Sequence, residues 1–218
     1  MRKLTVNTFM SLDGVMQAPG GPEEDPSGGF AYGGWSVNHW DEHMGEQMGA
    51  AMSEPFDLLL GRKTYEIFAA HWPHVTDDPG AEALNSATKY VASRTLDKVE
   101  WKNSILIVGD VVEEIARLKS DSSPEIQVHG SSDLIQTLLK NDLIDEFRLW
   151  TFPVLLGTGK RLFSDGTIPG GLKLVDSTTS STGVVIGTYE RAGEVDVGSF
   201  ALDEPTEAEL ERRSRMED

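Results

Sequence analysis

One ten-residue segment, residues 57–66 (DLLLGRKTYE), constrains the fold of this chain more than any other. The apolar run 58–60 is typical of a buried strand, and Gly61 ends it. A helix is expected over 64–70, with the hydroxyl of Thr64 as its cap. The segment therefore predicts a strand that passes through a glycine turn directly into a helix.

Two cations stand at that turn. Arg62 and Lys63 follow the glycine, where a helix N-terminus presents unpaired backbone N–H groups and the positive end of the helix dipole. A guanidinium adds paired hydrogen bonds to phosphate oxygens. The turn is expected to bind an anion, and a nucleotide cofactor is the commonest carrier of a phosphate at such a place. The alternative is an ordinary capped helix.

Two later segments repeat this arrangement. A strand at 89–93 is followed by Arg94 and Thr95, and a strand at 126–129 is followed by Gly130 and a helix that Ser131 or Ser132 caps. The carboxyl ends of parallel strands share one edge of a sheet, where ligands bind. The three turns are therefore expected to contact different phosphates of one extended dinucleotide.

The order of the remaining segments indicates an α/β fold. Helices and strands alternate first and strands alone follow, which is typical of a mostly parallel sheet with antiparallel strands added at its C-terminal end. A Gly- and Pro-rich loop is expected over 15–35. The other expected strands are 4–10, 104–108, 145–152, 172–178 and 183–191, and the other expected helices are 38–52, 111–119 and 134–140.

Composition narrows the class of function. The formal net charge of −17 disfavours nucleic acid and anionic membranes as partners. The chain has no cysteine, no apolar run near the roughly 20 residues that span a bilayer, and no signal peptide pattern, so a cytoplasmic protein is expected. One domain is predicted over 1–192, followed by an acidic tail over 193–218.

Residues 39–43 (HWDEH) match a zinc-protease pattern, H-x-x-E-H. On a helix, His39 and His43 would share one face and suit a metal. No third ligand is evident, so no metal is expected. A zinc hydrolase that uses the two histidines is kept as an alternative.

Six segments, taken together and in order, resemble those of a known family. They are SLDG (11–14), LGRKTYE (60–66), VASRT (91–95), GSSDL (130–134), LIDEFRL (143–149) and FPVLLGTGKRLF (152–163). The set spans about residues 3–191. It resembles the dihydrofolate reductase-like superfamily, and within it the C-terminal reductase domain of riboflavin-biosynthesis deaminase/reductases and its stand-alone bacterial relatives.

The resemblance implies a three-layer αβα fold and NADPH-dependent reduction. It assigns Arg62 to the 2′-phosphate of NADPH, with Ser93 and Arg94 beside it, and residues 130–134 to the pyrophosphate. The chain has a single glycine at 130, where the family often has two. The residues expected to contact the cofactor are Gly61, Arg62, Lys63, Thr64, Ser93, Arg94, Thr95, Gly130, Ser131, Ser132 and Leu134.

The resemblance also implies a small heterocyclic substrate. This is a pterin or a riboflavin-precursor pyrimidine, as for a 5-amino-6-(5-phosphoribosylamino)uracil reductase. Trp35, Trp40 and Phe152 are candidates for stacking on it, with core packing as the alternative. Asp41 and Asp13 are the candidate catalytic acids; a helix cap and a turn contact are their alternatives. A homodimer is implied as well. A nucleotide-binding module without catalysis is the second functional hypothesis.

Overall fold

The structure is a computed structural model that describes residues 1–216. Eight strands, six α-helices and three short 3₁₀ helices follow one another in those residues. The strands are β1 (Leu4–Ser11), β2 (Phe56–Gly61), β3 (Lys89–Ala92), β4 (Ser104–Ile107), β5 (Glu125–Gly130), β6 (Glu146–Phe152), β7 (Leu172–Thr179) and β8 (Val185–Arg191). The helices are η1 (Ser27–Gly29), η2 (Val37–His39), α1 (Glu42–Ala51), α2 (Arg62–His71), η3 (Trp72–His74), α3 (Pro79–Ser86), α4 (Val111–Lys119), α5 (Ser132–Lys140) and α6 (Glu207–Ser214).

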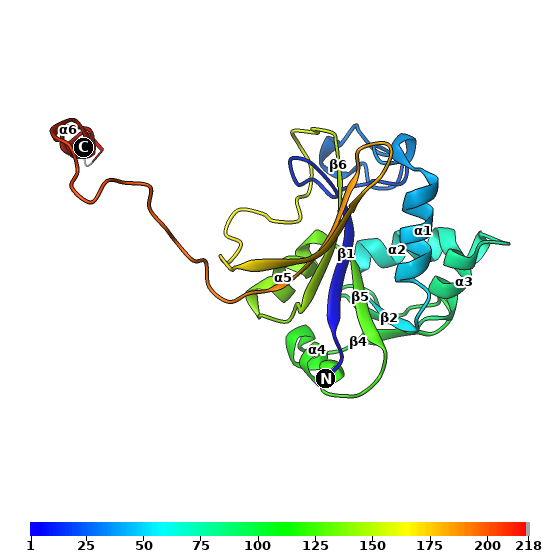
Figure 1. Ribbon diagram of the computed structural model, residues 1–218. Coiled ribbons are helices and arrows are strands. Elements are labelled where there is room, and N and C mark those ends of the chain that lie inside the picture. The colour runs from blue at the N-terminus through cyan, green and yellow to red at the C-terminus, as the bar shows by residue number, and fades with distance from the viewer. Residues whose placement is uncertain (217–218) are drawn as a thin grey trace.

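All eight strands form one sheet, in the order β4-β3-β2-β5-β1-β6-β8-β7. The pairings from β4 to β6 are parallel, whereas β8 pairs antiparallel with both β6 and β7. Figure 1 shows α1, α2 and α3 on one side of this sheet and α4 and α5 on the other. The predicted three-layer α/β fold, mostly parallel with antiparallel C-terminal strands, is confirmed.

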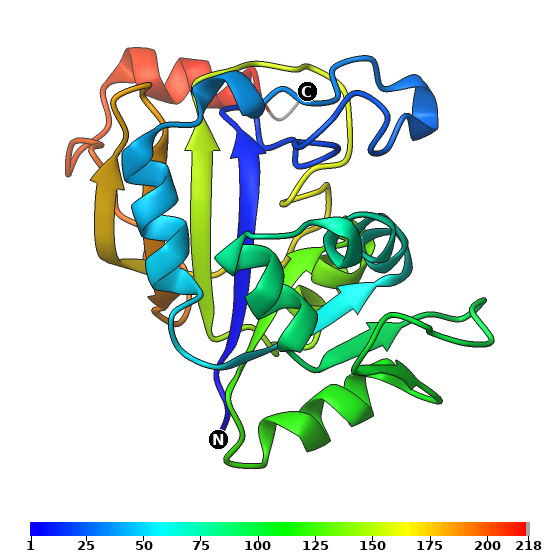
Figure 2. The same ribbon diagram turned by 90° about the vertical axis from the view of Figure 1, so that its right-hand side faces the viewer.

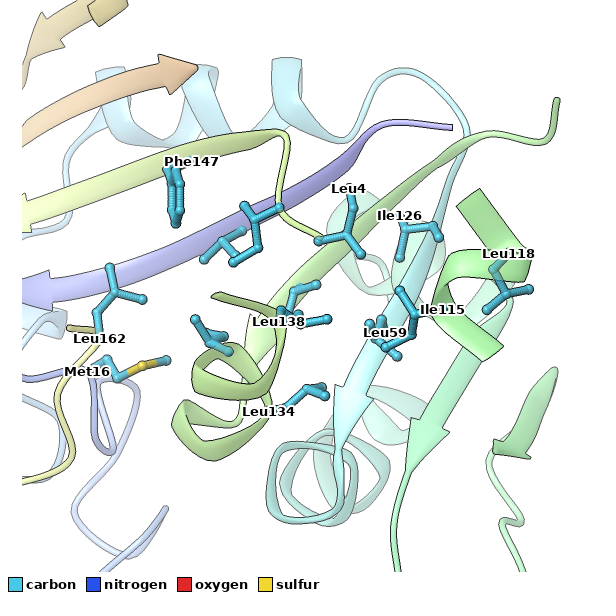
Figure 3. Packing of buried hydrophobic residues seen from close by; sticks show 14 of the residues in the cluster. Leu4, Met16, Leu59, Ile115, Leu118, Ile126, Leu134, Leu138, Phe147 and Leu162 are labelled. Atoms are coloured by element: carbon cyan, nitrogen blue, oxygen red, sulfur yellow. The ribbon is translucent and has the colours of Figure 1, made fainter. Parts of the chain in front are cut away.

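The apolar run of β2 is continuous because helices cover both faces of the sheet. Leu59 packs against α4 and α5 in the larger core cluster, which also contains Leu4, Ile115 and Leu138 (Figure 3). Leu58 and Leu60 point the other way, into a cluster with α2 and α3. None of the three β2 leucines is exposed to solvent.

The structure corrects several predicted helix boundaries. Helix α2 begins at Arg62 with Gly61 as its N-cap, so Thr64 lies in the first turn and does not cap the helix. The helix predicted from residue 38 begins at Glu42, because the carboxylate of Asp41 accepts a hydrogen bond from the N–H of Met44 and caps it there. Helix α3 was not predicted from the sequence; Pro79 follows its N-cap, Asp78.

The C-terminal residues extend away from the sheet toward α6 (Figures 1 and 2). Residues 193–208 are exposed. The division into a domain at 1–192 and a tail stays a prediction. Within residues 1–216, no helix is both long and apolar enough to cross a membrane.

Candidate active site

The three turns singled out in the sequence meet at one edge of the sheet. Strand β2 lies between β3 and β5 and is parallel to both, so their carboxyl ends are neighbours. Gly61 lies beside Ala92, which immediately precedes Ser93, and Leu60 lies beside Gly130. The three turns therefore lie at the same edge of the sheet, as the sequence predicts.

Two helices that begin at this edge lack side-chain caps. The N-caps of α2 and α5 are Gly61 and Ser131, and neither makes a side-chain cap hydrogen bond. The other four α-helices of the described chain are capped by side chains: Asp41, Asp78, Asp110 and Thr206. The first-turn N–H groups of α2 and α5 therefore have no side-chain acceptor at the N-cap and suit a phosphate.

Glycine is required where these two turns touch. A Cβ atom on Gly61 would overlap the hydroxyl of Ser131 and lie 2.9 Å from its backbone nitrogen. A Cβ atom on Gly130, whose φ is +155°, would lie 2.6 Å from Oγ1 of Thr64. The peptide between Gly130 and Ser131 is cis. The two glycines therefore allow the turns to approach each other closely.

A cavity of about 910 Å³ opens beside these turns, between β1, α1 and α2. Its size matches sites that enclose a small ligand. Five residues from the sequence prediction line it: Trp40, Lys63, Thr64, Ser131 and Ser132. Gly61 lies against Ser131, and Gly130 lies against Thr64.

One part of the cavity is aromatic and apolar. Phe9, Met48, Phe68 and Trp72 line it together with Trp40, whose ring stacks on Trp150 at a centroid distance of 6.2 Å and an interplanar angle of 7°. Trp40 is 45% exposed, so its ring remains available to a ligand. Flat apolar walls of this kind suit a planar ring.

The other part is polar and is organised by Asp25. The carboxylate of Asp25 bonds to Nζ of Lys160, and its Oδ1 lies 3.4 Å from Nζ of Lys63. Burial opposes ionisation of Asp25, but the hydrogen bonds from Lys160 and Ser27 outweigh it and lower its pKa to about 2. The loop between β1 and α1 is thereby tied to the first turn of α2.

Besides Asp25, two titratable groups in the cavity wall have shifted pKa values and were not predicted from the sequence. Burial raises the pKa of Glu24, although the N–H groups of Gly20 and Gly21 donate to its carboxylate. Burial also lowers the pKa of His129 to about 4. No motif identifies either residue. Glu24 lies in the irregular loop between β1 and α1, and His129 is the last residue of the strand that the sequence predicts over 126–129.

Asp13 does not line the cavity. Its carboxylate accepts hydrogen bonds from the Ser11 hydroxyl at 2.6 Å and from the N–H groups of Leu156 and Gly157 at 3.1 and 2.8 Å. These bonds, the one from Ser11 above all, lower its pKa to about 2. The structure favours the alternative in which Asp13 holds a turn.

Asp41 is likewise engaged elsewhere. One carboxylate oxygen caps α1, and the other accepts hydrogen bonds from the N–H and the hydroxyl of Ser181, both at 2.7 Å. The bond from Ser181 is the main reason that its pKa is lowered. Asp41 does not line the cavity, so the geometry favours the helix-cap alternative over a catalytic acid.

Three more predicted residues belong to the core. Phe152 is fully buried, and Trp35 packs against it edge-on while donating its indole N–H to the carbonyl of Gln17. Neither ring lines the cavity, so the prediction that they stack on substrate is replaced by core packing. Leu134 is buried in the cluster under α5, so only its backbone lies near the turn.

The turn after β3 lies outside the main cavity. The hydroxyl of Ser93 accepts hydrogen bonds from the N–H groups of Thr95 and Leu96, and the side chain of Arg94 is exposed. Thr95 lines a separate hollow with Tyr65 of α2. This turn reaches a ligand only if that ligand extends past the N-terminus of α2, as a dinucleotide does.

The zinc pattern is not realised. His39 ends η2, and the extended backbone at Trp40 and Asp41 separates it from α1, so it does not share a helix face with His43. The imidazole of His43 contacts the Thr178 hydroxyl at 2.9 Å. Residues 1–216 contain no group of three or more His, Cys, Asp or Glu side chains arranged to hold a metal ion.

Comparison with known proteins agrees with this fold. The chain is 31% identical to the uncharacterized protein YyaP of Bacillus subtilis over 201 residues, which cover 88% of the chain and 96% of YyaP. A putative riboflavin biosynthesis protein from Shewanella superposes with a TM-score of 0.63 and 26% identity, covering 88% of this chain and 99% of that one.

A dihydrofolate reductase from Enterococcus faecalis, solved with NADP(H), superposes with a TM-score of 0.55 and 16% identity, covering 87% of this chain and 96% of that one. At that identity the likeness shows the fold alone. The model of the RibD C-terminal domain matches residues 2–186. The chain therefore belongs to the RibD C-terminal domain family, with a dihydrofolate reductase-like fold.

Proposed function

We propose that the protein is an NADPH-dependent reductase of a small heterocyclic substrate, a pterin or a pyrimidine related to the precursors of riboflavin. One observation carries the proposal. Helices α2 and α5 begin beside the cavity without the side-chain caps of the other four described α-helices, and they begin where a phosphate-bearing cofactor would lie against a pocket for a planar ring.

The turns before α5 and α2 would each contact a different phosphate of the cofactor. The N–H groups at the start of α5 would hold the pyrophosphate, and those at the start of α2 would hold the adenosine phosphate with Arg62. The guanidinium of Arg62 is 44% exposed and pairs with Glu66 at 3.3 Å, an exposed pair that costs little to exchange for a phosphate. Bound NADPH supplies the hydride; the chain supplies position and an enclosed, apolar surface.

Titration calorimetry of the full chain with NADPH and with NADH tests this. We expect NADPH to bind more tightly, and Arg62→Ala to weaken NADPH binding about 10- to 100-fold, as loss of charge-assisted hydrogen bonds worth about 1.5–3 kcal/mol implies. NADH binding should change little. Arg117→Ala removes an equal charge from the exposed face of α4 and should leave both affinities unchanged.

Absence of binding by either nucleotide would contradict the proposal. Binding of NADPH without turnover of any pterin, pyrimidine or flavin precursor would favour the non-catalytic nucleotide-binding module. Assembly as a homodimer and a cytoplasmic location stay predictions, which size-exclusion chromatography with light scattering and cell fractionation would test.

A further inference from the structure

Adjacent strands place two polar side chains in the wall of the cavity. Val6 of β1 lies beside Val128 of β5 in parallel register, and Asn7 and His129 are the residues that follow them. The two valines point into the core under α4 and α5, and the side chains that follow them point to the opposite face. Asn7 and His129 both line the cavity there.

The orientation of the Asn7 amide is set by a tryptophan. The indole N–H of Trp150 donates to Oδ1 of Asn7 at 3.1 Å, and an indole N–H is a donor only. The oxygen of the amide is therefore on that side, and its Nδ2 faces away from Trp150. Asn7 is 1% exposed, and Nδ2 has no hydrogen-bond partner among the described residues.

His129 presents a second nitrogen of the same kind. Its Nε2 is enclosed and unpartnered within the described part of the chain, and its ring packs against Phe68 with a centroid distance of 6.0 Å. Burial first, and then the positive charge of Arg148, keep its pKa low, so the imidazole is neutral near pH 7. A neutral imidazole offers one donor and one acceptor.

Enclosed polar nitrogens without partners are unfavourable in a folded protein and are uncommon. Two of them in the wall of one cavity lined by aromatic rings are explained by a ligand that bonds to both. Nδ2 of Asn7 is a donor and requires a hydrogen-bond acceptor on that ligand. Nε2 of His129 can pair with an acceptor or with a donor, depending on which ring nitrogen carries the proton.

The charged side chains of the cavity lining disfavour a substrate that carries a phosphate. Glu23, Glu24, Asp25 and Asp78 line the cavity, and they outnumber the lysines there. The two lysines of the lining, Lys63 and Lys160, both pair with Asp25. Among the described lining residues, a phosphate on the substrate, in addition to those of the cofactor, would find no lysine without a carboxylate partner.

We propose that Asn7 and His129 bind the hydrogen-bonding edge of an uncharged planar heterocycle that carries no phosphate. Phe9, Trp40 and Phe68 enclose its ring. This inference rests on the proposed reductase function, because it names the substrate class of the same cavity. It favours a pterin-like ring over a phosphoribosylated pyrimidine.

Titration calorimetry with lumazine, an uncharged pteridine, and with uridine 5′-monophosphate tests the inference. We expect the wild-type protein to bind lumazine more tightly than the nucleotide. Asn7→Asp keeps an acceptor for Trp150 and removes the amide donor, and it should weaken lumazine binding at least tenfold, as should His129→Leu. The NADPH affinity of Asn7→Asp should stay within about threefold of wild type.

Thr5→Val is the matched control, because Thr5 lies on the same face of β1 and its hydroxyl donates to Glu125 at 3.2 Å outside the cavity. Its lumazine affinity should equal that of wild type. Circular dichroism shows whether each variant folds, and Asn7→Ser replaces Asn7→Asp if the latter does not.

Equal lumazine affinity in the wild type and in both variants would overturn the inference, as would tighter binding of the nucleotide or no binding of lumazine by the wild type. Failure of NADPH to bind would overturn the proposed function instead. Lumazine binding that depends on Asn7 and His129 would still stand in that case, so the two failures are distinguishable.

Discussion

Nζ of Lys63 lies 3.4 Å from Oδ1 of Asp25, a residue 38 positions earlier in the chain. Lys63 is in the first turn of α2, at the predicted phosphate turn, and Asp25 is in the long loop that precedes α1. The carboxylate therefore neutralises a cation that a phosphate would otherwise contact.

Asp25→Asn should tighten NADPH binding about three- to tenfold, because it releases Lys63 and Lys160 for the cofactor at the cost of ion pairs worth about 1 kcal/mol. Calorimetry at low and high salt would measure this, and the gain should shrink at high salt. Glu23→Gln makes the same change of charge in the cavity wall without a lysine contact and is the control. An equal gain in both variants would show that general charge, and not the ion pair, limits binding.

The contact between the turns at Gly61 and Ser131 predicts a steric effect. Gly61→Ala should lower the free energy of unfolding by about 1–3 kcal/mol, because the new Cβ overlaps Ser131 and the two backbones must separate. NADPH affinity should fall as well.

Urea unfolding measures the first effect. Gly49→Ala in α1 is the matched control, since a Cβ at Gly49 meets no atom within 4 Å. It should raise the free energy of unfolding by about 0.5–1 kcal/mol, the usual helical preference of alanine over glycine. A stable Gly61→Ala protein with wild-type affinity would contradict the close packing of the two turns.

Lys89 predicts a dependence of stability on alkaline pH. Its side chain is fully buried, with Nζ donating to the carbonyls of Asn85 and Lys102 at 2.7 and 2.9 Å and lying over the Trp101 ring. Burial lowers its pKa to about 8 from 10.5. Between these two values the unfolded chain binds more protons than the folded protein, so the free energy of unfolding should rise with pH there.

Urea unfolding at several pH values from 7 to about 10.5 would check this rise. In Lys89→Met the rise should be absent, because the group responsible is gone. Lys98→Met is the control, since Lys98 is exposed and pairs with Glu100 at 2.7 Å. The same slope in wild type and Lys89→Met would show that another group causes it.

Substitution of Asp41 distinguishes a helix-capping role of this residue from a catalytic role. If it serves only as the cap of α1 and the acceptor for Ser181, Asp41→Ala should lower the melting temperature and leave NADPH and lumazine affinities unchanged. Its lowered pKa means that its contribution to stability is present above the usual Asp pKa and is lost as pH falls through the folded value.

Asp110→Ala removes the cap of α4, away from the cavity, and is the comparison. A loss of ligand affinity or of reductase turnover in Asp41→Ala that Asp110→Ala does not show would restore the catalytic hypothesis for Asp41.

The sequence alone predicted the elements that rest on local patterns. The apolar run 58–60 indicated a buried strand, and the alternation of strands and helices indicated a mostly parallel sheet. Gly61 was identified because it ends the apolar run, and Gly130 because it stands between a strand end and the start of a helix. These features depend on residues that are close together in the chain, so they can be predicted from the sequence.

Only the tertiary structure decided which side chains face the cavity. Asp41 precedes a helix in the sequence whether it caps that helix or meets a substrate, and the contact with Ser181, 140 residues later, decides between the two. Asn7 and His129 lie in strands far apart in the chain and reach the same cavity only because β1 and β5 pair in the sheet. Side-chain contacts at such separations depend on how the strands pair, which no local pattern of residues encodes.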